Sequence, residues 1–201
     1  MKKSFFTLVE LLTVIAIIIV LAGILLPAIS GSLKKADVTK ARAQMTTLAN
    51  AIKQYQSTYG RLPIPTRTPT AYSDGDALTS TEYTKLILTL QNETKSGVLS
   101  AAQLTTANPK KIKFLDIVGN EPGEYKDPWD EDFQVFMDAN YDDKIKDATV
   151  PGLKGSDFYY SVLIFSKGPD GKDDSAANNK DNKDNIYSIS TKWNDGHNIE
   201  K

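Results

Sequence analysis

The sequence predicts an α+β protein in which a long N-terminal helix packs on a small antiparallel β-sheet domain. Three observations lead to this prediction. Apolar residues recur at helical spacing in the N-terminal third, and neither Gly nor Pro occurs from Ser32 to Tyr59. Short segments rich in aromatic and β-branched residues appear only after Lys111. The chain has no internal repeat, and helix first with strands last is typical of the α+β class.

The first half of the long helix is strongly apolar. Lys2 and Lys3 precede it, and Glu10 lies at its start. The run from Leu11 to Ile29 contains one polar residue, Thr13, and one proline, Pro27. At about 1.5 Å per residue this run spans roughly 28 Å, about the thickness of the hydrocarbon core of a bilayer. A carboxylate at the edge of such a segment is costly without a partner, which indicates that Glu10 has a function.

Two simpler interpretations of this segment compete with a functional one. A secretory signal peptide has an apolar stretch of only about 7–15 residues, and the run here is longer. A plain single-pass membrane anchor fits the length. Neither interpretation explains the order of a basic pair, Phe6, Glu10 and then the apolar run.

The second half of the helix carries an apolar stripe on a polar background. Its members recur three or four residues apart: Leu33, Ala36, Ala41, Met45, Leu48, Ala49, Ile52 and Tyr55. This spacing predicts that residues 36–59 face a core. Gly60 and Pro63 are expected to end the helix, and Pro27 is expected to kink or locally melt it.

The chain resembles type IV prepilins and type II secretion pseudopilins at positions 6–12 (Phe-Thr-Leu-Val-Glu-Leu-Leu). In that family a prepilin peptidase cuts before the Phe and methylates the new amino terminus, and the glutamate is needed for filament assembly. The resemblance therefore implies cleavage between Phe5 and Phe6 and methylation of the new amino terminus at Phe6. It also implies assembly through Glu10 and a helix-kinking role for Pro27. Phe5 stands where the family usually has Gly, and a cut after the smaller Ser4 is the alternative.

The resemblance also implies a domain order and a location. Residues 1–5 would be a leader peptide, 6–30 a transmembrane and assembly helix, 31–60 the second half of the long helix, and 61–201 a globular domain. Basic residues on both sides of the apolar run do not settle its orientation. By resemblance, the chain crosses the bacterial inner membrane once, with its N-terminus cytoplasmic and its C-terminal domain periplasmic.

Short helices and strands are expected in the globular part. The Thr-, Pro- and Ser-rich region 61–110 predicts an exposed loop, a short helix near Thr81–Glu93 and a possible second one around Leu99–Ala107. Aromatic and β-branched runs then predict strands at Gln134–Met137, Phe158–Phe165 and Ile186–Ser190.

Composition narrows the possible chemistry. The chain has no Cys and a single His, so it offers neither a Ser/His/Asp nor a Cys/His catalytic set, and no phosphate-binding glycine motif appears. An enzyme is therefore not expected. The net charge of −1 argues against nonspecific nucleic-acid binding. A small polar domain without disulfides needs another stabilising device, and we expect a metal ion.

An acidic loop near the C-terminus is the first candidate metal site. Positions 166–171 (Ser-Lys-Gly-Pro-Asp-Gly) resemble the Ser-Leu-Gly-Ala-Asp-Gly of type II secretion major pseudopilins. Positions 127–133 (Asp-Pro-Trp-Asp-Glu-Asp-Phe) resemble their Asp-Pro-Trp-Gly-x-x-Tyr. In that subfamily the loop holds one calcium ion. The resemblance implies these ligands: the main-chain carbonyl of Lys167 and the carboxylates of Asp170 and Asp184, with Asp173, Asp174 and Asn185 as further candidates. A solvated loop without metal is the alternative.

A second acidic loop follows the first predicted strand. Asp138, Asn140 and Asp142 match the first three ligand positions of an EF-hand-type calcium loop. Asp143 stands where such loops have Gly, and Thr149 where they have a bidentate Glu. An Asp/Asn-rich turn without metal is the alternative.

The resemblance predicts a structural subunit of a type II secretion pseudopilus, a helical homo-oligomeric filament in the periplasm that drives protein export. The implied partners are the prepilin peptidase, the inner-membrane assembly platform, minor pseudopilins and, before assembly, membrane lipid; nucleic acid is not expected. The alternatives are a type IV pilus subunit for adhesion, motility or DNA uptake, and a membrane-anchored calcium-binding module that does not polymerise.

Overall fold

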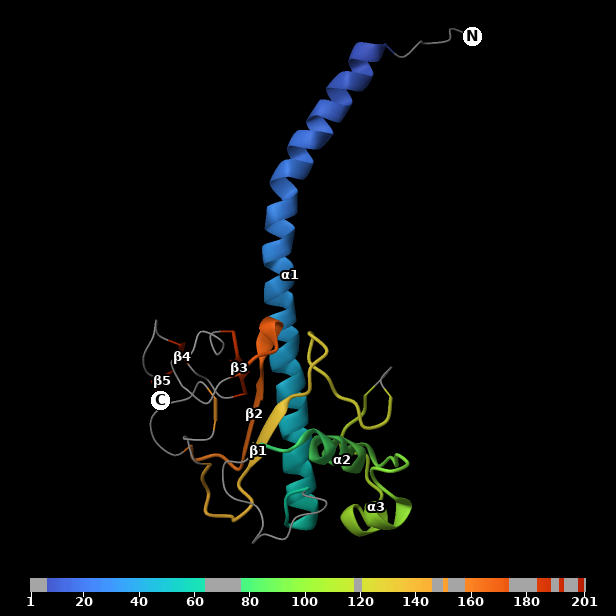
Figure 1. Ribbon diagram of the computed structural model, residues 1–201, viewed down its shortest axis with the longest axis vertical. Coiled ribbons are helices and arrows are strands. Elements are labelled where there is room, and N and C mark those ends of the chain that lie inside the picture. Colours follow the sequence, from blue (N-terminus) through green and yellow to red (C-terminus); the bar gives the residue numbers. More distant parts are fainter. Residues whose placement is uncertain are drawn as a thin grey trace. The chain divides into compact units, whose positions relative to one another are not determined.

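A computed structural model of the protein describes residues 7–63, 77–117, 121–145, 150–151, 158–173, 184–188, 192–193 and 199–200 (Figure 1). Its elements, in chain order, are α1 (Leu8–Tyr59), α2 (Ser80–Gln91), α3 (Ala101–Ala107), β1 (Gln134–Met137), β2 (Val162–Ser166), the 3-10 helix η2 (Gly168–Asp170), β3 (Ile186–Tyr187), β4 (Lys192–Trp193) and β5 (Ile199–Glu200). The chain forms two compact units, Met1–Thr39 and Lys40–Lys201. Helices together with a small antiparallel sheet confirm the predicted α+β class.

The first unit contains the start of α1. The backbone stays helical through Pro27, so the predicted local melting there is wrong. A proline removes a single backbone hydrogen bond from the ladder, and the rest of the helix remains paired. Leu33 and Ala36, which belong to the predicted apolar stripe, are exposed, so the prediction is wrong for these two positions. Among the residues that the structure describes, no helix is long and apolar enough to span a membrane.

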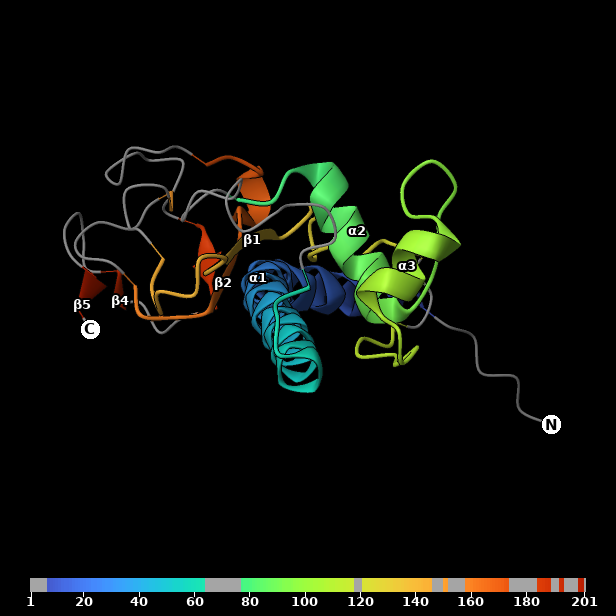
Figure 2. The same cartoon turned by 90° about the horizontal axis from the view of Figure 1, so that it is seen from below.

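The second unit contains the core, and the end of α1 supplies one side of it. Buried side chains recur along that helix at the predicted spacing: Ala41, Met45, Leu48, Ile52 and Tyr55. Figure 2 shows the three-stranded sheet on one side of this part of α1 and the two short helices on the other. The predicted core-facing role of residues 36–59 is therefore confirmed for these positions.

The two short helices have clear caps. Thr79 and Glu82 form a reciprocal capping box at the start of α2, and Asn92, in the left-handed conformation, ends it. Ser100 and Gln103 form the same kind of box before α3. Both predicted helices are thus confirmed, with α2 starting one residue earlier and ending two residues earlier than expected.

A buried amide joins the three helices. Asn108 is fully buried and donates to the carbonyl oxygens of Thr89 and Ile112, while its side-chain oxygen accepts from the Tyr59 hydroxyl. A buried amide is tolerated only when its donors and acceptors are paired, as they are here. This contact fixes the end of α1 against the segment that follows α3.

The main sheet has the order β1-β2-β3 and is antiparallel throughout. Gln134 pairs with Phe165, and Phe165 in turn pairs with Tyr187. The second predicted strand begins at Val162 rather than Phe158, and Phe158 instead forms an isolated bridge with Ile145. Strand β3 covers the first two residues of the third predicted strand; Ile189 and Ser190 lie outside the described residues. A separate pair, β4 and β5, follows.

Both faces of the main sheet are buried. Its side chains on one face form a cluster with residues from the following loop: Phe136, Ile145, Val150, Leu163, Phe165 and Tyr187. On the other face Val135 and Ile164 are fully buried. The loops that leave β1 and β2 therefore start from a rigid base, and these are the two loops in which calcium sites are predicted.

Candidate functional site

The first turn of α1 holds Glu10 in a local hydrogen-bond system. One carboxylate oxygen of Glu10 accepts from the backbone N–H and the hydroxyl of Thr7, each at 2.8 Å. The Thr7 hydroxyl oxygen accepts in return from the Glu10 backbone N–H at 3.2 Å. This is a capping box, which satisfies backbone donors that a helix start otherwise leaves unpaired. Phe5 and Phe6, the predicted cleavage position, lie outside the described residues, and nothing is described of the Pro27 side chain.

Exposed apolar side chains follow Glu10 along the helix. The large ones between the helix start and the limit of the described side chains are Leu8, Val9, Leu11, Leu12, Val14, Ile15, Ile17, Ile18, Ile19, Val20, Leu21 and Ile24. A contiguous apolar surface of this extent is rare on a monomeric soluble protein and marks a surface that another molecule covers.

A buried carboxylate connects the two segments that resemble major pseudopilins. Asp127 is only 6% exposed, and one of its oxygens accepts from the backbone N–H groups of Trp129 and Glu131, both at 2.9 Å. Its other oxygen accepts from the hydroxyl of Ser166 at 2.5 Å. The Ser166 oxygen accepts from the N–H of Gly168 at 3.1 Å. Asp127 thus ties the Asp-Pro-Trp turn to the first turn of the acidic loop.

The acidic loop brings the backbone of Asp170 to the side chain of Asp184. A side-chain oxygen of Asp184 accepts from the backbone N–H of Asp170 at 3.3 Å. Gly168, with φ of +72°, lies so close that a Cβ there would overlap the Asp184 carbonyl oxygen and lie 3.1 Å from its carboxylate. Only glycine fits this approach. The contact of Asp170 with Asp184 is made by the backbone of Asp170; the Asp170 carboxylate accepts instead from the backbone N–H of Lys172 at 2.9 Å, so the ligand set stays a prediction.

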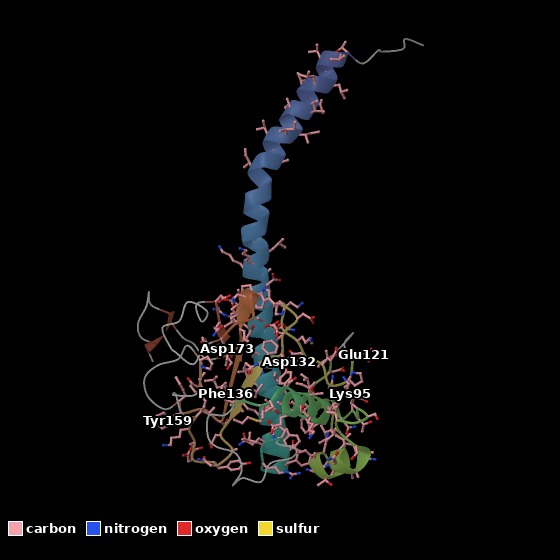
Figure 3. The ribbon with its side chains drawn as sticks, viewed as in Figure 1. Lys95, Glu121, Asp132, Phe136, Tyr159 and Asp173 are labelled. Carbon is pink, nitrogen blue, oxygen red and sulfur yellow. The ribbon has the colours of Figure 1, made fainter. Side chains whose placement is uncertain are left out.

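Two further predicted ligands of this loop, Asp173 and Asn185, contact a lysine and a tyrosine side chain. Asp173 forms an ion pair with the ammonium of Lys167 at 3.2 Å, and Figure 3 shows Asp173 on the side of the sheet, away from Lys95 and Glu121. The Asn185 amide lies 3.5 Å from the Tyr187 hydroxyl, which donates to the Pro151 carbonyl oxygen at 2.6 Å. Burial raises the pKa of Tyr187 to about 12, so this hydroxyl remains a donor at neutral pH.

The predicted calcium ligands stay a prediction. Asp174 lies outside the described residues, and within the described residues no three acidic or His side chains converge as a ready-made metal site. One acidic neighbour was missed from the sequence: the Glu131 carboxylate lies 3.7 Å from the point where Gly171 would carry a Cβ. Its place in the acidic stretch that follows Trp129 was the available signal.

The loop after β1 is an Asp/Asn-rich turn whose oxygens point at its own backbone. The buried Asp138 carboxylate accepts from the N–H groups of Asp142 and Asp143, at 3.2 and 2.8 Å, and the Asn140 side chain also accepts from Asp142 at 2.9 Å. Asp143 has φ of +64°, the left-handed conformation that Gly adopts in EF-hand-type loops. Thr149, at the last ligand position of such a loop, lies outside the described residues.

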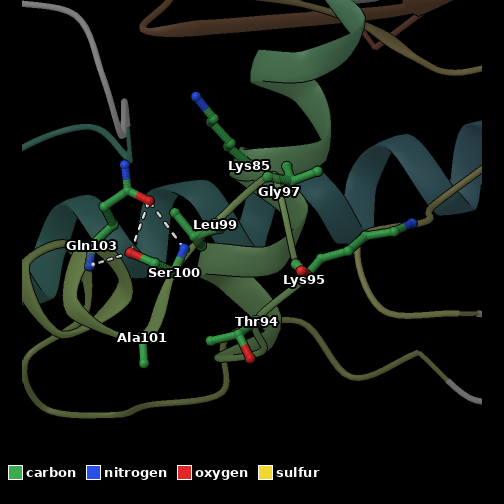
Figure 4. A pocket seen from close by; sticks show the side chains of 10 residues that line it. Lys85, Thr94, Lys95, Gly97, Leu99, Ser100, Ala101 and Gln103 are labelled. Atoms are coloured by element: carbon green, nitrogen blue, oxygen red, sulfur yellow. Dashed lines mark hydrogen bonds between the residues drawn. The ribbon is translucent and has the colours of Figure 1, made fainter.

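A hollow beside α3 offers no comparable chemistry (Figure 4). Its lining combines Lys85 and Lys95 with small polar and apolar residues of the turn that precedes α3. The polar groups of Ser100 and Gln103 within it already bond to each other in the cap of that helix. The acidic loop and the start of α1 therefore remain the candidate functional sites.

Comparison with known proteins identifies relatives of the chain. The chain is similar to a protein of Aeromonas hydrophila called type II secretion system core protein G, with 37% identity over 62 residues, which are 31% of this chain and 43% of that protein. A protein of the same name from Klebsiella pneumoniae is 25% identical over 175 residues, 85% of this chain and 87% of that protein. No family model and no solved structure matches.

These findings confirm the predicted resemblance to type II secretion pseudopilins. The match to the first relative covers less than half of that protein's length, whereas the match to the second extends over most of both chains. Both relatives are core proteins of a secretion system rather than enzymes, which confirms the expectation that the chain is not an enzyme.

Proposed function

We propose that the chain is a structural subunit of a type II secretion pseudopilus, which polymerises through its N-terminal helix. The observation that carries this proposal is the similarity to core protein G over most of the chain. The exposed apolar side chains at the start of α1 support it, because they need a cover that other copies of the same helix can supply.

In this proposal the apolar run to Ile29 lies in the bacterial inner membrane before assembly. The N-terminus is cytoplasmic and the C-terminal domain periplasmic, and a prepilin peptidase removes residues 1–5 and methylates Phe6. The subunit then leaves the lipid and joins a periplasmic filament, with an inner-membrane assembly platform and minor pseudopilins as partners. Phe5, in place of the family's Gly, favours a second candidate: an unprocessed membrane-anchored module that does not polymerise.

Glu10 is the residue with which to test assembly. We expect Glu10→Gln to abolish filaments of the full-length chain produced together with a prepilin peptidase, as seen by electron microscopy. Glutamine can still serve in a capping box, so this variant keeps the helix start and removes only the charge that would pair with a neighbouring amino terminus. Glu10→Ala, which loses both, is expected to behave the same way.

The outcome of that experiment separates the roles of Glu10. Filaments of normal length with Glu10→Gln, but none with Glu10→Ala, would show that Glu10 acts through the cap alone. Mass spectrometry of the same preparations reads the processing step: an intact Met1 in wild type contradicts the filament proposal and favours the unprocessed module.

We also propose that the acidic loop holds one calcium ion. The residues that would hold it are Asp170 and Asp184 through carboxylates and Lys167 through its carbonyl, with Asp173, Asp174 and Asn185 as further oxygen donors. The ion would neutralise carboxylates of the loop and hold the loop ends together. The donor set, all oxygen, is what calcium prefers, and the loop path that brings Gly168 close to Asp184 also brings the backbone of Asp170 to the Asp184 carboxylate.

Calcium removal tests this part of the proposal. We expect a chelator to lower the melting temperature of the detergent-solubilised full-length protein by roughly 5–10 °C, since calcium at about 100 times Kd stabilises by about 2.7 kcal/mol. Asp170→Ala and Asp184→Ala should abolish the shift. Asp142→Ala, in the loop after β1, is the control and should retain it; the opposite pattern would place the ion in that other loop.

A further inference from the structure

We infer that one exposed face of α1, which carries Arg42 and Lys53, binds the acidic turn of a second copy of this chain, formed by Asp130, Glu131 and Asp132. This inference rests on the proposed filament and names a lateral contact within it. The proposed function assigns assembly to the apolar start of α1, whereas both surfaces of this contact belong to the second unit.

The part of α1 in the second unit is basic. Between Lys40 and Tyr59 the sequence contains Lys40, Arg42 and Lys53 and no carboxylate. Arg42 and Lys53 are about three helical turns apart, so they lie on the same face, separated by roughly 16 Å along the axis. Both are exposed, and so is Thr46, one turn after Arg42. Within the described part of the chain, neither Arg42 nor Lys53 forms an ion pair.

The turn that precedes β1 carries the opposite charge. Asp130, Glu131 and Asp132 are consecutive, and Lys126 pairs with Asp130 at 3.4 Å, so a net negative charge remains. The Asp130 side chain is 89% exposed, and Glu131 is exposed as well. The buried Asp127 carboxylate accepts from the backbone N–H of Glu131 at 2.9 Å, which fixes the backbone of the turn. The acidic turn is therefore a rigid surface rather than a loose loop.

The two surfaces lie on different sides of α1. The Gln44 side chain donates to the carbonyl oxygen of Lys126 at 2.8 Å, so the segment that leads into the acidic turn lies along the Gln44 side of the helix. Two residues along an α-helix differ in direction by about 200°, so Arg42 points away from that side. Lys53 shares the face of Arg42 and also points away. The basic face and the acidic turn therefore do not meet within one copy.

This arrangement favours a second copy as the occupant. When one subunit has complementary surfaces on different sides, each copy can offer its basic face to one neighbour and its acidic turn to another. Contacts of this heterologous kind continue from copy to copy and build rings or helical filaments. Because the exposed charged residues of the face are cations, the occupant has to bring carboxylates, and the acidic turn supplies them.

The contact has a limited energetic role. A single exposed ion pair contributes little affinity. Once the apolar starts of neighbouring α1 helices associate, however, the acidic turn and the basic face are held at a high effective concentration. The apolar start of α1 then supplies most of the affinity, and the ion pairs select how neighbouring domains are oriented.

Charge reversal tests the contact in the full-length chain produced together with a prepilin peptidase. We expect Arg42→Glu and Glu131→Lys each to lower the filament yield in electron micrographs about ten-fold, because like charges then face each other. The double variant restores opposite charges in reversed order and should recover about half of the wild-type yield or more. Lys40→Glu is the matched control: it makes the same change on the Gln44 side, and its yield should stay within about two-fold of wild type.

Cross-linking tests the same contact by proximity. The chain has no Cys, so Arg42→Cys and Glu131→Cys introduce the only thiols. In filaments that contain both single variants, one of them with an added tag, we expect a short bismaleimide to join the tagged to the untagged chain. A chain that carries both substitutions should give a ladder of multimers. Lys40→Cys mixed with Glu131→Cys is the control and should give far less product.

The outcomes separate this inference from the proposed function. Normal filaments with Arg42→Glu, or filaments without cross-links between Arg42→Cys and Glu131→Cys, would overturn the inference and leave the proposed function intact. Loss of filaments with Arg42→Glu that Glu131→Lys does not rescue would overturn it as well, and would assign the face to another occupant such as anionic lipid. A wild type that forms no filaments would refute the proposed function, and the inference with it.

Discussion

Asp127→Ala is expected to destabilise the second unit by about 3 kcal/mol or more. The substitution leaves the N–H groups of Trp129 and Glu131 and the hydroxyl of Ser166 without their acceptor, in a place where the removed carboxylate was 6% exposed. Each buried donor left unpaired costs about 1–3 kcal/mol. Urea unfolding of the detergent-solubilised protein, followed by tryptophan fluorescence, measures the loss.

Two further variants control this prediction. Asp127→Asn keeps the side-chain shape and one acceptor oxygen, so its stability should lie between that of wild type and that of the alanine variant. Asp130→Asn removes the same charge from the same turn, but the Asp130 side chain is 89% exposed, and it should change stability by no more than about 0.5 kcal/mol. A loss with Asp127→Ala no larger than with Asp130→Asn would show that the buried bonds contribute little.

The local elements of this fold could be predicted from sequence, because their signals lie within a few residues. The spacing of Met45, Leu48 and Ile52 defines the buried face of α1, and the segment around β1 carries enough apolar residues to identify a buried strand. The sequence also contains the pattern of the α1 capping box, which is Thr7 followed three residues later by Glu10. The resemblance added a role for Glu10 in assembly, and the structure adds its local one.

The connections between loops could not be predicted in the same way. The sequence marks both the Asp-Pro-Trp turn and the loop that starts at Ser166, yet nothing in it pairs Asp127 with Ser166, 39 residues away. That contact depends on how β1 and β2 align, since the turn precedes β1 and the loop follows β2. The Lys167–Asp173 pair likewise depends on the path of η2, which brings together two side chains that spacing alone leaves unrelated.

Gly168→Ala is expected to be the most damaging substitution in the acidic loop, with a loss of about 3 kcal/mol. Two costs add in this variant. The φ of +72° is unfavourable for any residue with a Cβ, by about 1–2 kcal/mol, and the new Cβ would overlap the carbonyl oxygen of Asp184. Backbone cannot move aside as a flexible side chain does, so the loop must separate from Asp184.

Gly97→Ala isolates the first of these costs. Gly97 has φ of +76°, but a Cβ there would meet no atom within 4 Å, so its loss should stay near 1 kcal/mol. Calcium gives a second measure: Gly168→Ala should abolish the calcium-dependent rise in melting temperature, because it separates Asp170 from Asp184, whereas Gly97→Ala should retain it. Equal losses in the two variants would show that the approach of Gly168 to Asp184 does not hold the loop together. Retention of the calcium response in Gly168→Ala would place the ion away from that contact.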